Sequence, residues 1–166
     1  MRLTAPVPRR SVLALVGALV PRGVLAASAG DDIALAVIVA PTSKLTHISF
    51  EDLRNTFRSS PIGDGEGNHL IALNHPPRTE DRVGFDRVVL GMDPDAVGRF
   101  WIARKVRGES GPPRSVPSLT NLRRVVEKLP GAIGYIRPAQ LSSQVRAIRV
   151  DGKLPEDPGY RVRYRP

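Results

Sequence analysis

The chain has 166 residues, enough for one ordinary domain and too few for two. It contains no cysteine, which excludes disulfides, thiolate metal sites and cysteine nucleophiles. The formal net charge of +9 falls to +5 for residues 30–166, because four of the 25 basic residues and none of the 16 acidic ones lie in residues 1–29. This mild excess suits an anionic ligand, and it equally suits a solvated basic surface; it does not require nucleic acid.

Residues 1–29 have the pattern of a cleavable export signal. Arginines precede an apolar run of ten residues, Ser11 to Val20, which is too short to cross a membrane. Small residues at Ala27 to Ala29 predict cleavage before Gly30. We therefore expect a periplasmic or secreted protein with one domain over residues 30–166 and no stable membrane insertion after cleavage. The alternative is that the apolar run forms an N-terminal helix of the domain.

The exported part begins with a strand and a capped helix. The continuous apolar run from Ile33 to Ala40 predicts a strand buried on both faces of a sheet. Ser49 and Asp52 form a capping pattern before apolar residues at helical spacing, so a helix should begin there. A turn-rich loop over residues 59–68 leads to a second short strand over residues 70–73.

Two helices are expected next. Thr79 is a good N-cap, and apolar residues then recur at helical spacing from Phe85 to Met92. Asp93 followed by Pro94 marks the start of another helix. We expect the buried face of that helix to consist of Val97, Phe100 and Trp101.

The last third of the chain alternates again between helix and strand. Residues 107–117 are rich in glycine and proline and should form a loop without regular structure. Ser118 caps a further helix, and strands follow over residues 132–136 and 145–150. The tail after Asp151 is an edge strand or is loosely held. The alternation of strands and helices indicates an α/β fold.

Four stretches together resemble the phosphate-type substrate-binding proteins of ABC transporters, and most closely a short, single-lobe branch of that family. They are LRNTF at 53–57, IALN at 71–74, VLGM at 89–92 and PGAIGY at 130–135. The resemblance covers residues 33–150. It implies an α/β fold: a single lobe of a type II periplasmic binding protein-like fold, with a mixed central sheet and helices on both faces. A complete binding protein has two lobes that close on the ligand, and this chain supplies one.

The resemblance also implies a ligand loop before a helix. Thr79 falls at the position of the family's loop serine, Arg78 stands where glycine is usual, and Asn74 falls near the loop's leading arginine. A helix N-terminus offers free N–H groups and partial positive charge to an anion, and a hydroxyl or guanidinium adds donors.

Arg82 flanks the same helix start. Thr42 and Ser43, after the first strand, would join the site if both loops lie at one edge of the sheet. Acidic residues after Thr79 would repel an anion. An interpretation without a ligand is therefore also open, in which Thr79 only caps its helix and the arginines are solvated.

The sequence predicts an exported solute-binding module of the phosphate ABC transporter type. It would bind a small oxyanion such as phosphate weakly, or with a partner lobe from a homodimer, a transporter or another envelope protein. The alternative is an envelope interaction protein that kept this fold and lost ligand binding.

Other function classes find little support. The sequence has no GxSxG, HExxH or Walker A pattern, so we expect no enzyme and no cofactor. His47, His69 and His75 show no metal-ligand spacing, and we expect no metal. Export argues against a nucleic-acid partner.

Overall fold

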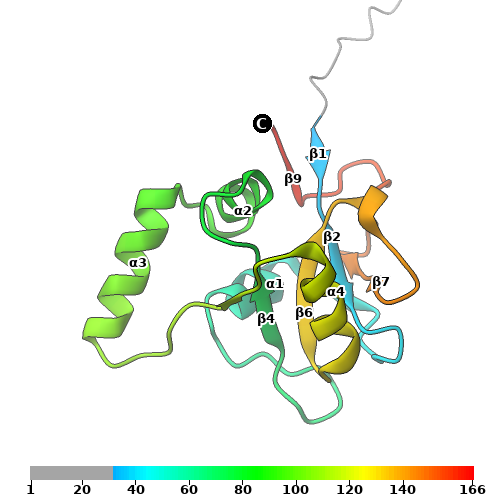
Figure 1. Ribbon diagram of the computed structural model, residues 1–166, viewed down its shortest axis with the longest axis horizontal. Helices are drawn as coiled ribbons and strands as arrows, with labels where there is room; N and C mark the ends of the chain where they lie inside the picture. Colours follow the sequence, from blue (N-terminus) through cyan, green and yellow to red (C-terminus); the bar gives the residue numbers. More distant parts are fainter. Residues whose placement is uncertain (1–31) are drawn as a thin grey trace, which may run out of the picture.

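A five-stranded mixed sheet lies at the centre of the computed structural model, which describes residues 32–166 (Figure 1). In sheet order the strands are β5 (Arg114–Ser115), β4 (Ile71–Asn74), β6 (Ala132–Ile136), β2 (Ala36–Val39) and β7 (Arg146–Ala147). Strand β4 runs parallel to both β5 and β6, whereas β2 runs antiparallel to β6 and β7. The export signal predicted for residues 1–29 lies outside the described residues.

The helices begin where the sequence predicts. They are α1 (Phe50–Phe57), α2 (Glu80–Phe85) with its π-helical continuation η1 (Asp86–Leu90), α3 (Pro94–Val106), α4 (Leu119–Lys128) and the short 3₁₀ helix η2 (Pro138–Gln140). The side chains of Ser49, Asp93 and Ser118 accept an N–H of the first turn of α1, α3 and α4. These three caps fix the helix starts, as expected for Ser and Asp. None of the helices within residues 32–166 is long and apolar enough to cross a membrane.

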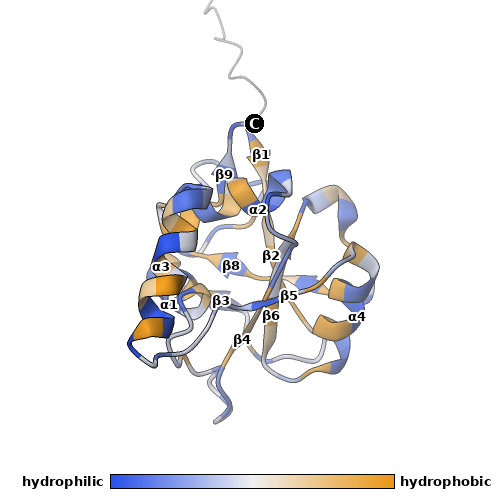
Figure 2. Cartoon of the chain, turned by 60° about the vertical axis from the view of Figure 1, so that its left-hand side comes forward, coloured by the Kyte–Doolittle hydropathy of each residue, from blue (hydrophilic) through white to orange (hydrophobic). Residues whose placement is uncertain are grey.

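Helices cover both faces of the sheet, as predicted. Figure 2 shows α1 and α4 on opposite sides of β2 and β6. On one face, Phe85 stacks on Tyr135 with ring centroids 3.8 Å apart, and Phe57 packs beside them. On the other face, Leu122 and Val126 of α4 are fully buried against the sheet. Strands β2 and β6 are buried along their whole length for this reason, which explains their continuous apolar sequences.

Two small sheets connect distant parts of the chain. Strand β1 (Ile33–Ala34) pairs antiparallel with β9 (Arg163–Tyr164), and β3 (His47–Ile48) pairs parallel with β8 (Arg149–Val150). The tail therefore ends in a paired strand. The apolar run that predicts one strand from Ile33 is divided at Leu35, whose N–H donates to the Val162 carbonyl at 2.9 Å. Residues 145–150 are likewise divided between β7 and β8.

Two local predictions are wrong. Residues 107–117 are not entirely irregular, because β5 pairs with the end of β4 and the Val116 N–H donates to the Asn74 carbonyl at 2.8 Å. Phe100 and Trp101 are only partly covered, and Val97 is the one residue of α3 that is buried. Helix α3 lies apart from the sheet, at the far left of Figure 1.

Candidate functional site

Polar side chains gather at the edge of the sheet where β4, β5 and β6 end. The three strands lie side by side, and β4 runs parallel to each of the other two, so their last residues meet at one edge. We call this the carboxyl edge, and it comprises Asn74, His75, Ser115 and Arg137 together with the first turn of α2. Ligands of open α/β sheets bind outside the carboxyl ends of the strands.

Asn74 lies within the edge and supports it. Its side chain is 1% exposed, and its Oδ1 accepts hydrogen bonds from the Tyr135 hydroxyl and from the His75 N–H at 3.1 Å. Burial raises the pKa of Tyr135 far above its ordinary value, so the phenol stays a proton donor. The His75 Nε2 lies 2.8 Å from the Tyr135 carbonyl, and the Ser115 hydroxyl donates to the His75 carbonyl at 3.2 Å. The Asn74 oxygen is therefore occupied by protein donors.

Thr79 is the N-cap residue of α2, but its side chain does not cap. The hydroxyl donates instead to the Pro76 carbonyl at 2.9 Å. Helices α1, α3 and α4 each have a capping side chain, whereas the first turn of α2 has none. N–H groups at a helix start have no partner within the helix, so those of α2 are left to an external acceptor.

Arg78 precedes Thr79 in a strained backbone conformation. Its φ is +66°, in the left-handed region that favours glycine, and its side chain is exposed. The resemblance implied glycine at this position, and the structure retains the conformation that glycine would take. The Arg78 side chain is thus exposed directly before the start of α2.

Arg82 is buried rather than solvated. Its Nε lies 2.5 Å from the Asp86 Oδ2, and its Nη1 donates to the His75 carbonyl at 3.4 Å. Burial raises the pKa of Asp86, and the neighbouring Arg82 charge opposes that rise. Asp86 and the His75 carbonyl therefore hold the Arg82 guanidinium inside the protein, beneath the carboxyl edge.

Arg137 neutralises the acidic residues at the start of α2. It follows β6 directly, and its Nε lies 2.7 Å from Asp81 while its Nη2 lies 2.8 Å from Glu80. The Tyr164 hydroxyl also donates to the Asp81 carboxylate at 2.7 Å. These bonds to Asp81 and Glu80 raise the pKa of Arg137. The sequence analysis missed Arg137 and Tyr164, although the position of Arg137 directly after a predicted strand was a usable signal.

The structure does not bring Thr42 and Ser43 to the carboxyl edge. Because β2 is antiparallel to β6, the end of β2 lies beside the start of β6. Thr42 and Ser43 there line a small pocket of about 180 Å³ together with Glu127 and Gly131. Thr42 and Ser43 were predicted to join the site only if they shared a sheet edge with Thr79. They lie at the opposite end of the sheet, so they are not part of it.

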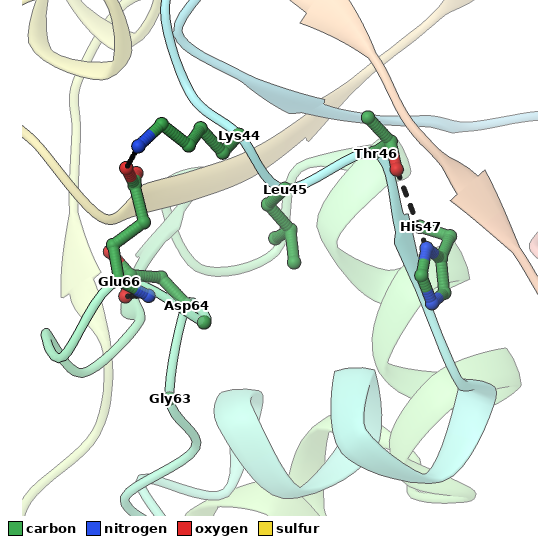
Figure 3. Close-up of a pocket in the computed structure, with 8 residues that line it drawn as sticks. Lys44, Leu45, Thr46, His47, Gly63, Asp64 and Glu66 are labelled. Atoms are coloured by element: carbon green, nitrogen blue, oxygen red, sulfur yellow. Dashed lines mark hydrogen bonds and ion pairs between the residues drawn. The ribbon is translucent and has the colours of Figure 1, made fainter.

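A larger pocket of about 580 Å³ lies near that opposite end of the sheet (Figure 3). Lys44 reaches across it to Glu66, with 3.0 Å between Nζ and Oε1. The Asp64 carboxylate accepts the side-chain amide of Asn68 at 3.0 Å and the backbone N–H groups of Glu66 and Asn68, and this bonding lowers the pKa of Asp64. Each of these charged side chains therefore already has a partner within the protein. Within residues 32–166 there is no cluster of three or more His, Asp or Glu residues able to hold a metal.

Comparison with known proteins supports the fold. No protein-family model and no curated protein matches the sequence. Solved structures do match, among them three that each share 15% sequence identity with this chain. They include an ABC-type phosphate transport receptor from Vibrio cholerae (TM-score 0.64, 80% of this chain and 54% of that one). They also include a phosphate ABC transporter substrate-binding protein with bound phosphate from Clostridium perfringens (0.58, 75% and 47%) and PstS from Borrelia burgdorferi (0.58, 80% and 55%).

The coverage and the sequence identity determine what the similarity to these structures shows. The chain spans about half the length of the binding proteins it matches. At 15% identity the likeness concerns the fold and not the ligand. The mixed five-stranded sheet, with helices on both faces, is the architecture that the sequence predicted. The chain thus has the fold of a single lobe of a type II periplasmic binding protein, of the PstS-like kind.

Proposed function

We propose that this protein is an exported solute-binding module that binds a small oxyanion, phosphate in the first place, at the start of α2. The observation that carries the proposal is the uncapped first turn of α2 at the carboxyl edge. The neighbours with the same fold are named as phosphate transport receptors and substrate-binding proteins, and one was solved with phosphate bound.

The donors at this edge suit a tetrahedral anion. The first-turn N–H groups and the positive end of the helix dipole attract negative charge. The Thr79 hydroxyl can rotate from the Pro76 carbonyl to an anion oxygen, and the exposed Arg78 guanidinium adds a bidentate donor. Arg137 holds Glu80 and Asp81, so the two carboxylates are partly neutralised by their own ion pairs.

A single lobe should bind weakly. Three charge-assisted hydrogen bonds contribute roughly 5–9 kcal/mol. Association costs about 4 kcal/mol or more. The difference is at most about 5 kcal/mol, so the dissociation constant should be no tighter than about high micromolar to millimolar. Tight capture then requires a second lobe, supplied by another copy of the chain, a transporter or another envelope protein.

Isothermal titration of the purified protein with phosphate at low ionic strength tests the site. We expect saturable heat for the wild type and its loss in Thr79→Ala, because this substitution removes a donor that no neighbour replaces. Thr42→Ala is the matched control, since Thr42 is exposed at the opposite end of the sheet. It should leave the heat unchanged.

The absence of heat up to tens of millimolar phosphate would contradict the proposal. That result is what an envelope interaction protein without ligand binding would give. Equal loss of heat in Thr42→Ala and Thr79→Ala would place any binding site elsewhere than the start of α2.

A further inference from the structure

Helix α3 has an outer face that no part of the described chain covers. Asp95, Gly98, Ile102 and Lys105 follow one another at spacings of three, four and three residues, so they form one stripe along the helix. All four are exposed, and Val106 lies at the end of the stripe. Ile102 and Val106, at 66% and 82% exposure, are the two most exposed large hydrophobic residues of the described chain.

The neighbouring side of α3 holds the helix in place. Val97 is buried, and Trp101 packs against the main hydrophobic cluster. Arg104 lies over the Trp101 ring, donates to the Arg58 carbonyl at 2.7 Å and pairs with Glu109 at 2.9 Å. The helix is thus anchored on one side and presents its outer stripe in a fixed orientation.

We propose that this stripe is the contact surface for a second copy of the same chain, with the two α3 helices packed antiparallel about a two-fold axis. The two-fold axis passes the helices at the level of Phe100. A residue a given number of positions before Phe100 therefore lies opposite the residue that number of positions after Phe100 in the second copy. Ile102 then faces Gly98 of the second copy, and Lys105 faces Asp95 of the second copy. Both contacts occur twice, as a two-fold interface requires.

Charge selects the antiparallel arrangement. The stripe carries its acid, Asp95, in the first turn of α3 and its base, Lys105, in the last turn. Antiparallel helices bring these opposite charges together, whereas parallel helices would oppose acid to acid and base to base.

Gly98 fits the same arrangement. Glycine destabilises a helix interior relative to alanine, and nothing in the described chain requires it at this position. A Cβ built on Gly98 would have no atom within 4 Å, and its backbone is not in the left-handed region. In the proposed pair, the missing side chain leaves room for the Ile102 side chain of the second copy.

The interface is small, so the pair should be weak. A helix of 13 residues is about 20 Å long, and one of its faces supplies less than the roughly 800 Å² per partner of a standard interface. We expect a dissociation constant of about 10 μM to 1 mM. This inference does not depend on phosphate binding, because α3 is not part of the carboxyl edge.

Analytical ultracentrifugation of the purified full chain tests the pair. We expect concentration-dependent dimer formation that Ile102→Asp weakens by about tenfold or more. Leu141→Asp is the matched control, since Leu141 is an exposed hydrophobic residue outside α3. It should leave the dimer unchanged. A wild type that stays monomeric up to about 1 mM, or equal loss in both variants, overturns the proposal.

Cross-linking tests the antiparallel geometry independently. The chain has no cysteine, so Asp95→Cys and Lys105→Cys each introduce a single thiol. A short bismaleimide should join the two variants when they are mixed, and should join neither variant efficiently to itself. Charge reversal adds a third readout: Asp95→Lys and Lys105→Asp should each weaken the dimer, and the double variant should restore it. Cross-links that form as readily in the unmixed proteins contradict the antiparallel pair.

Discussion

Arg78 shows how a residue other than glycine can occupy a left-handed turn directly before a helix. Its left-handed backbone conformation is one that glycine adopts without strain. The resemblance implied glycine at this position, and the turn between Pro77 and Thr79 does have a positive φ in this chain.

Arg78→Gly should therefore stabilise the fold by about 1 kcal/mol, because it removes the strain of a side chain in the left-handed region. The greater freedom of glycine in the unfolded chain offsets part of this gain. Chemical denaturation of wild type and variant measures the difference. If Arg78 also binds the anion, the same variant should be more stable and bind phosphate less tightly. A variant that is less stable than wild type would show that the guanidinium has a structural role.

At the scale of elements, α2 and α3 each contain one glycine, and the two are there for different reasons. A Cβ at Gly84 of α2 would lie 2.3 Å from the Tyr164 ring, which the hydroxyl bonds of Tyr164 hold in place. The ring of β9 thus rests directly on the α2 backbone. At Gly98 of α3 a Cβ would meet open space.

Gly84→Ala should destabilise the protein by about 1–3 kcal/mol, because either the ring or the helix must move. Gly98→Ala is the matched control, and in dilute solution it should stabilise the protein by about 0.5–1 kcal/mol through better helix propensity. Thermal unfolding at low protein concentration measures both. Similar changes in the two variants would contradict the close contact between α2 and β9.

Elements that depend on nearby residues could be predicted from the sequence, and those that depend on distant partners could not. Capping residues and apolar spacing located α1, α3 and α4 because these signals lie within a few residues of each helix start. Strand β5 was missed because it is defined by pairing with β4, about 40 residues earlier, and not by its own composition. The apolar run from Ile33 is divided at Leu35 for the same reason, because the Leu35 N–H bonds to Val162 near the other end of the sequence.

At the scale of the whole molecule, the direction of β2 decides which loops can share a site. The order of strands and helices predicted an α/β sheet but not that β2 runs against β6, and this orientation separates Thr42 and Ser43 from Thr79. Arg137 reaches the site through the parallel pairing of β6 and β4. The directions of the strands, which no local sequence pattern encodes, therefore determine which of these residues belong to the candidate site.

The tail is also tied to the first helix, and this contact is sensitive to pH. The Asp151 carboxylate accepts the Phe50 N–H at 2.9 Å and pairs with Arg161 at 3.0 Å. The bond from Phe50, with the Arg161 charge, lowers the pKa of Asp151 below its ordinary value of 3.8. A group with a lowered pKa in the folded state stabilises the fold above its unfolded pKa, and the benefit is lost as the pH falls through the folded value.

Asp151→Asn should therefore be less stable than wild type near neutral pH, and the difference should shrink as the pH falls from about 5 to about 3. Asparagine keeps an oxygen acceptor and tolerates the positive φ of this residue, so backbone strain does not confuse the comparison. Urea unfolding of both proteins across this pH range measures the effect. A difference that stays constant with pH would show that Asp151 acts through shape alone.

The pairing of β1 with β9 has a consequence for how the chain is made. These strands lie 130 residues apart in sequence yet side by side in space, and the Tyr160 hydroxyl donates to the Leu35 carbonyl at 2.8 Å (Figure 1). A growing polypeptide cannot complete this closure until β9 has left the ribosome. The fold of the described domain therefore stays incomplete until β9 has been synthesised and can pair with β1.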